Sequence, residues 1–162
     1  LGSAATFIPP GEMYVALERG LIDGLATNWE KAVAFKEFEV TTYRTEADLW
    51  VNIMPIFMNL EAWNRLPDRL KQSLEANSGG EFSRYAGILF QKGEREAREL
   101  ILRLDKERKR PEPYAVPEAE RERWRELLAT VYQEWTAELK DKGIEEGETI
   151  LKEAFRLANE YR

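Results

Sequence analysis

Cysteine and histidine are both absent from this chain of 162 residues. Without cysteine the chain can form no disulfide, no thiolate metal site and no thiol nucleophile, although this says nothing about its compartment. Without histidine it can contain no Ser-His-Asp triad, no histidine general base and no imidazole metal ligand. These two absences exclude much of ordinary enzymology from the residues of this chain.

Long apolar runs and an excess of positive charge are also missing. No apolar run approaches the roughly 20 residues that a helix needs to cross a bilayer. The 30 acidic side chains outnumber the 24 basic ones and give a net charge of -6. A general electrostatic attraction to nucleic acid or to an anionic membrane is therefore not expected. The hydrophobic fraction of 43% is enough for one globular core or for parts of two.

The densest local signals lie between residues 12 and 29, EMYVALERGLIDGLATNW. Apolar residues recur at helical spacing over residues 11–19 and a glycine follows them, which predicts a short amphipathic helix. A brief buried strand is then predicted at residues 21–22, followed by a turn at Asp-Gly. Asn28 is well placed to cap a second helix that begins at Trp29.

Further strands are predicted from β-branched and aromatic content. The candidates are residues 4–8, 39–44 and 49–58, together with a short edge strand, EPYAV, between Pro111 and Pro117. Two amphipathic helices are predicted to follow, one from Pro117 to just before Gly143 and one from about Glu148.

A long helix is predicted to open at Leu66-Pro67-Asp68 and to continue to about residue 104, with proline in its first turn. Internal glycines weaken it by roughly 1 kcal/mol each relative to alanine. If unbroken, it would span about 50 Å at roughly 1.5 Å per residue. Residues 105–110, DKERKR, are expected to be a solvated helix end that complements the helix dipole, in preference to a phosphate or nucleic-acid contact.

Three motifs together resemble a known family. The run ALERGLIDG at residues 16–24 is followed by Phe38-Glu39-Val40 and then by NLEAWNRLPD at residues 59–68. In their order and spacing they resemble the extracytoplasmic solute-binding proteins of TRAP transporters, of the DctP type. The resemblance implies an α/β fold of the periplasmic-binding-protein kind. In this fold a two-lobed receptor has mixed sheet strands, a long spine helix and C-terminal helices.

The resemblance also implies that this chain is the C-terminal portion of such a receptor, which is about twice as long. It divides residues 1–162 into a ligand-loop segment at 1–40, crossover strands at 41–66, the spine helix at 67–110, and a C-terminal strand and helices at 111–162. The N-terminal half of the family sequence includes an arginine that pairs with the substrate carboxylate, and that half lies outside these residues.

The function implied by the resemblance is binding without catalysis and without a cofactor. Such a receptor captures a small organic anion, a carboxylate, in the periplasm and delivers it to the TRAP membrane permease; nucleic acid is not a partner. A fragment that begins at a strand would also leave a sheet edge open, so self-association or strand exchange is expected. The alternative interpretation is a helical protein–protein interaction module without a small-molecule ligand.

Five residues are predicted to contact the ligand. Many family members have Gln-Glu-Asn-Pro after the Asp-Gly turn, and the asparagine contacts the ligand. Here Thr27 takes the asparagine position and Asn28 the proline position, although both residues could simply cap the following helix. Trp29 and Trp50 are candidates for apolar pocket walls, with core packing as the alternative for Trp29. Asp48 is added because the family chain crosses between lobes near this point.

Overall fold

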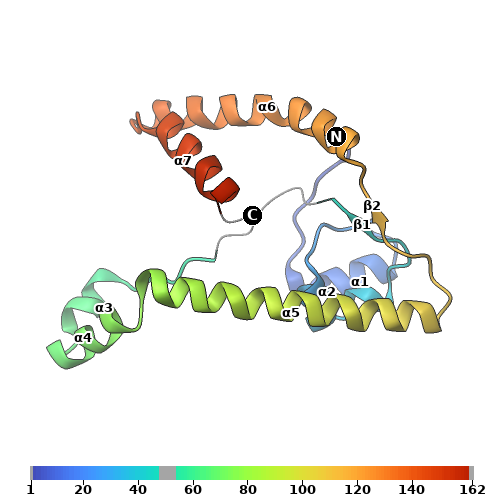
Figure 1. Cartoon of the computed structure of the whole chain (residues 1–162), viewed down its shortest axis with the longest axis horizontal. Coiled ribbons are helices and arrows are strands. Elements are labelled where there is room, and N and C mark those ends of the chain that lie inside the picture. Colours follow the sequence, from blue (N-terminus) through green and yellow to red (C-terminus); the bar gives the residue numbers. More distant parts are fainter. Residues whose placement is uncertain (1, 48–53, 161–162) are drawn as a thin grey trace. The chain divides into compact units, whose positions relative to one another are not determined.

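The computed structural model describes residues 2–47 and 54–160. It divides into two compact units, one formed by Ala5–Ala115 and the other by Leu1–Ala4 with Val116–Arg162. Helices predominate in both units, and the described strands form a two-stranded sheet (Figure 1). No helix among the described residues is long and apolar enough to cross a membrane.

The first unit begins with a short turn of 3-10 helix, η1 (Pro10–Glu12), which leads into α1 (Met13–Glu18). The helix predicted at residues 11–19 is therefore confirmed. It ends as its sequence predicts, because Gly20 adopts a left-handed conformation with φ of 67°. The backbone N–H of Leu21 then bonds back to the carbonyl of Ala16 at 2.8 Å.

This helix ending explains why the buried strand predicted at residues 21–22 is wrong. The backbone bends there, and Leu21 is 74% exposed. The N–H that a strand would give to its neighbour already satisfies a carbonyl at the end of α1. Further on, α2 (Trp29–Ala34) begins where predicted, and η2 (Glu37–Glu39) follows it.

The sheet consists of β1 (Thr45–Glu46) and β2 (Tyr114–Ala115), which pair in parallel with Thr45 opposite Tyr114. The edge strand predicted at EPYAV is thus confirmed. The strand predicted at 4–8 is wrong, because these residues have no ladder partner among the described residues. The strand predicted at 39–44 is also wrong, since a 3-10 turn and the loop after it occupy that segment. Of the strand predicted at 49–58, residues 49–53 lie outside the described residues and 54–58 have no regular structure.

The predicted long helix is divided into two. After a helix that the sequence did not predict, α3 (Leu60–Arg65), the chain forms α4 (Asp68–Ala76) and then α5 (Gly79–Glu107). The break falls where Gly79 has a positive φ of 75°. The 29 residues of α5 correspond to about 44 Å at roughly 1.5 Å per residue, so this helix is a scaffold for distant segments of the unit.

The buried core of the first unit forms where α2 packs against α5 (Figure 1). Ala32, Phe38 and Ile101 are its buried members, and Trp29, Val33 and Leu104 pack around them. Because α2 and η2 both contribute to this core, the loop just before α2 is attached to the middle of the long helix.

The second unit is a helical hairpin of α6 (Glu118–Asp141) and α7 (Gly147–Glu160), as predicted. The rings of Tyr132 and Phe155 meet edge to face with centroids 5.3 Å apart. A Cβ at Gly147 would lie 3.2 Å from Leu139 Cδ1, so a larger residue would fit at the start of α7 only if the Leu139 side chain moved by a few tenths of an ångström.

Candidate functional site

The loop before α2 is shaped by its own capping interactions. Asn28 has an extended backbone, and its Oδ1 accepts a hydrogen bond from the N–H of Lys31 at 3.2 Å. This is the side-chain cap predicted from the sequence. The amide oxygen of Asn28 is therefore engaged within the helix, and a ligand contact by this residue stays a prediction.

A carboxylate from the long helix completes the cap. Glu94 of α5 accepts hydrogen bonds from the backbone N–H groups of Trp29 and Glu30 through its two oxygens, at 3.0 and 2.9 Å. These N–H groups have no partner within the helix, and a negative charge there also complements the helix dipole. The start of α2 is thus fixed to α5 by a residue 65 positions away in the sequence.

Behind the loop lies a buried carboxylate, Glu37, which is only 1% exposed. The hydroxyl of Thr27 donates to its Oε2 at 2.8 Å. Lys31 Nζ lies 3.8 Å from Oε1, which is an ion pair but too long for a hydrogen bond. Thr41 holds the backbone of the same residue by donating its hydroxyl to the Glu37 carbonyl at 2.9 Å. Thr27 itself is an exposed residue, so this hydrogen bond joins a residue at the surface to a buried carboxylate.

A second buried carboxylate, Asp105, anchors the segment after α2. It is 3% exposed and contacts two guanidinium groups. Arg44 Nη2 donates to its Oδ1 at 3.1 Å and Arg44 Nε lies 3.0 Å from Oδ2, while Arg110 Nη1 lies 3.4 Å from Oδ1. Burial lowers the pKa of Arg44, and the neighbouring Asp105 opposes that effect.

The same two arginines hold the backbone of η2. Arg110 donates to the carbonyls of Phe38 and Glu39 at 2.6 and 2.8 Å, and Arg44 also donates to the Phe38 carbonyl, at 3.2 Å. The expectation of a solvated helix end at residues 105–110 is therefore wrong for Asp105 and Arg110. They belong to a buried ionic cluster that fixes η2 to the end of α5.

Trp29 is half-buried and packs against the core cluster. The guanidinium of Arg98 lies 5.8 Å from the centroid of its ring. Arg98 is in turn held by Glu46 of β1, with Nε 2.7 Å from Oε1, and this hydrogen bond raises the pKa of Arg98. Core packing, the alternative stated for Trp29, is thus observed.

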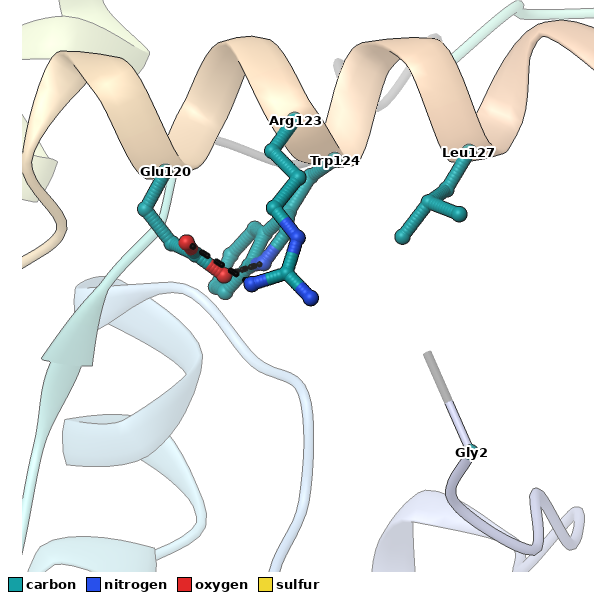
Figure 2. A pocket seen from close by; sticks show the side chains of 5 residues that line it. All are labelled: Gly2, Glu120, Arg123, Trp124 and Leu127. Atoms are coloured by element: carbon teal, nitrogen blue, oxygen red, sulfur yellow. Dashed lines mark hydrogen bonds and ion pairs between the residues drawn. The ribbon is translucent and has the colours of Figure 1, made fainter.

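Two of the hollows in the part of the chain that the structure describes bear on the site. One, of about 310 Å³, lies between α2 and α5 and is lined by Glu30, Val33, Ala34, Gly93, Glu96, Ala97 and Leu100. The other, of about 430 Å³, belongs to the second unit. In Figure 2 its lining side chains project from α6, with Glu120 bonded to Trp124, while Gly2 lies opposite. Neither hollow is lined by Thr27, Asn28 or Trp29.

The consecutive residues Thr27, Asn28 and Trp29 thus form the end of the loop and the start of α2, and they are held by Glu37 and Glu94. Asp48 and Trp50, the other two predicted ligand contacts, lie outside the described residues. No group of three or more acidic side chains with the arrangement of a metal site occurs in residues 2–47 and 54–160.

Sequence reasoning missed the charged residues that support the loop. A signal existed for one of them: Ala97, Ile101 and Asp105 are spaced four apart and lie on the buried face of α5. A carboxylate that continues a buried apolar row requires cations nearby. No comparable signal pointed to Glu94, because its role depends on a contact with a segment far away in the sequence.

A family comparison decides what kind of protein this is. The sequence profile described as "DctP: Bacterial extracellular solute-binding protein, family 7" matches residues 1–139. The chain belongs to this family. The resemblance inferred from the three motifs is therefore confirmed. This family is a class of solute-binding receptors and not a class of enzymes.

A solved structure of the same class shares the fold. The TRAP solute binding protein from Rhodoferax ferrireducens T118, described in complex with copurified benzoate, superposes with a TM-score of 0.73 at 24% sequence identity. The match covers 91% of this chain and 45% of that protein. The DctP-family chain described here thus spans less than half the length of this relative, and the predicted α/β receptor fold is confirmed over that part.

Proposed function

We propose that this chain is part of the substrate-binding subunit of a TRAP-type transporter, in which it helps to capture a small organic anion in the periplasm for delivery to the membrane permease. The family match over residues 1–139 carries this proposal. On this proposal the protein binds and releases its ligand and catalyses no reaction.

The loop of Thr27, Asn28 and Trp29 forms one wall of the proposed ligand site, and Asp48 and Trp50 contribute farther along the chain. The attachment of the loop supports this assignment. Because Glu94 and Glu37 fix the loop from two sides, little conformational freedom is left to lose when a ligand binds. The match covers 45% of the structural relative, and we place the opposite wall in the part of the receptor that this match does not cover.

Binding then works by closure of two lobes around the ligand. A ligand that contacts both lobes binds the closed form better than the open form and shifts the population toward it. The long helix α5 suits a spine, since it carries the supports of the loop at Glu94 and the buried ionic cluster at Asp105.

The test uses the natural gene product that carries this chain, purified without added ligand. We expect mass spectrometry of the denatured protein to detect a small carboxylate, and calorimetry to give one site per receptor. Benzoate is the first ligand to titrate, because it was copurified with the structural relative. Thr27→Val removes the hydrogen bond that ties the loop to Glu37 and should weaken binding through loss of that support, while Thr130→Val, a threonine change in α6, should not. Absence of any bound or binding organic anion would refute the proposal.

A weaker interaction is expected for the 162 residues alone. The resemblance implies that the arginine which pairs with the ligand carboxylate lies outside this chain. Without it, the free energy of one charged bidentate contact, typically about 1.5–3 kcal/mol per hydrogen bond, is lost. Tight carboxylate binding to this chain by calorimetry would contradict the expectation.

The alternative, a helical interaction module, has one observation in its favour. Large apolar side chains are exposed on the second unit, among them Leu127, Val131 and Ile150. Such a surface could dock a protein partner. Family membership favours the receptor. Calorimetric binding of a carboxylate that is weakened by Thr27→Val would decide between the two functions.

A further inference from the structure

The hydroxyl of Thr27 has one hydrogen and two acceptors within reach. Glu37 Oε2 lies 2.8 Å from Thr27 Oγ1, while the carbonyl oxygen of Asn28 lies 3.5 Å away. The shorter contact lies within the normal range for a hydrogen bond from a hydroxyl to an oxygen, and the longer one is beyond that range. The hydroxyl proton is therefore directed at Glu37.

Glu37 is held in place to receive that proton. Its side chain is buried, its backbone carbonyl accepts from Thr41, and Lys31 approaches its other oxygen at 3.8 Å without hydrogen-bond geometry. An ionised carboxylate has no proton to give and only accepts hydrogen bonds. A buried carboxylate that loses a hydrogen-bond donor costs free energy, so the hydrogen bond from Thr27 to Glu37 is expected to persist when a ligand binds.

What remains available at Thr27, which is an exposed residue, is the lone pairs of its hydroxyl oxygen. A hydroxyl without a free proton can accept a hydrogen bond but cannot donate one. A ligand carboxylate placed against Thr27 would find no donor there. It would also lie within roughly 5 Å of the Glu37 carboxylate, a distance at which like charges repel appreciably in a partly desolvated site.

We propose that Glu37 determines ligand specificity at Thr27 by making this hydroxyl a hydrogen-bond acceptor, so that it selects ligands with a hydroxyl or N–H group at this position and rejects a second carboxylate. This inference rests on the proposed function, in which Thr27 faces the ligand. The preferred ligand is accordingly a hydroxy acid or amino-substituted acid whose single carboxylate binds elsewhere in the site.

The test compares three end groups on the same carbon skeleton in the natural gene product. The aromatic series is benzoate, 3- and 4-hydroxybenzoate, and the corresponding benzenedicarboxylates, and the aliphatic series is butanoate, 4-hydroxybutanoate and succinate. Dissociation constants come from calorimetry. In one series or the other, we expect the hydroxy acid to bind about tenfold more tightly than its parent acid, the ratio that one neutral hydrogen bond supplies. The dicarboxylate should bind more weakly than either.

Variants then assign the effect to the pair. Thr27→Ser keeps the hydroxyl and should keep both the hydrogen bond to Glu37 and the preference. Thr27→Val should abolish the preference, and because it also removes the hydrogen bond to the buried Glu37 side chain, circular dichroism first establishes that this variant is folded. Glu37→Gln removes the negative charge, so the affinity for the dicarboxylate should rise about tenfold relative to the affinity for the hydroxy acid. Glu39→Gln is the matched control, because that side chain bonds to Tyr14 and not to Thr27, and it should leave both ratios unchanged.

The outcomes distinguish failure of this inference from failure of the proposed receptor function. Suppose that carboxylates bind, but the wild type binds the parent acid, the hydroxy acid and the dicarboxylate equally well, or Thr27→Val leaves the ratios of their dissociation constants unchanged. The specificity role of Glu37 is then wrong, while the receptor function stands. If Glu37→Gln does not fold, the threonine variants still decide the matter. If no carboxylate of either series or from the purified protein binds, both the inference and the proposed function are refuted.

Discussion

Replacing Asp105 by alanine should severely destabilise the first unit. The carboxylate meets Arg44 at 3.0 and 3.1 Å and Arg110 at 3.4 Å, and the Arg44 side chain is only 9% exposed. Removing the anion leaves two guanidinium groups in a poorly solvated place with backbone carbonyls as their remaining partners. Breaking a buried ionic cluster in this way costs about 3–5 kcal/mol. Asp105→Asn keeps one acceptor oxygen and should cost less, about 2 kcal/mol.

The measurement must distinguish the two units, because unfolding of a chain with two units is not one cooperative transition by default. Urea titration followed by circular dichroism gives the free energy of unfolding, and hydrogen exchange shows where protection is lost. We expect the loss in α2, η2 and α5 and none in α6 or α7. Glu107→Ala, an exposed change on the same helix, should stay within about 0.5 kcal/mol of wild type. A similarly small effect for Asp105→Ala would refute the reasoning.

Three further predictions follow from individual contacts. Glu94→Ala should destabilise the start of α2 by about 1–2 kcal/mol through loss of its cap, while Glu96→Ala, whose carboxylate pairs only with an exposed lysine among the described contacts, should not; amide exchange in α2 measures the difference. Desolvation and the neighbouring Glu39 raise the pKa of Tyr14. The folded state therefore holds the phenolic proton of Tyr14 more tightly than the unfolded state does. The resulting contribution to the free energy of unfolding is present below pH 10 and is lost as the pH rises through the folded pKa of Tyr14. Glu39→Gln should lower this pKa in a spectroscopic titration. Exposed apolar side chains predict self-association of this chain, and a monomer by light scattering at high concentration would contradict it.

The helices could largely be predicted because their signals are local. The end of α1 at Gly20 and the cap at Asn28 each depend on residues within a few positions of one another. The same is true of the amphipathic patterns of α5, α6 and α7. The break before α5 was not predicted, although the glycines that weaken this region were visible in the sequence.

Strands were predicted less well because a strand is completed by a partner elsewhere in the chain. Residues 4–8 have suitable β-forming side chains but no neighbouring strand among the described residues. Thr45 and Tyr114 pair across a long stretch of sequence, and only the tertiary structure brings them into register.

By itself, the sequence determined the family, most of the helices and the loop at Thr27 and Asn28, because motif spacing and capping are properties of short stretches. Only the tertiary structure decided how that loop is supported. Glu37 and Glu94 look like ordinary surface charges in the sequence, and packing of α2 and η2 against α5 turned them into a buried and a capping carboxylate. A buried charge must find its partners, and the fold determines which distant residues are close enough to serve.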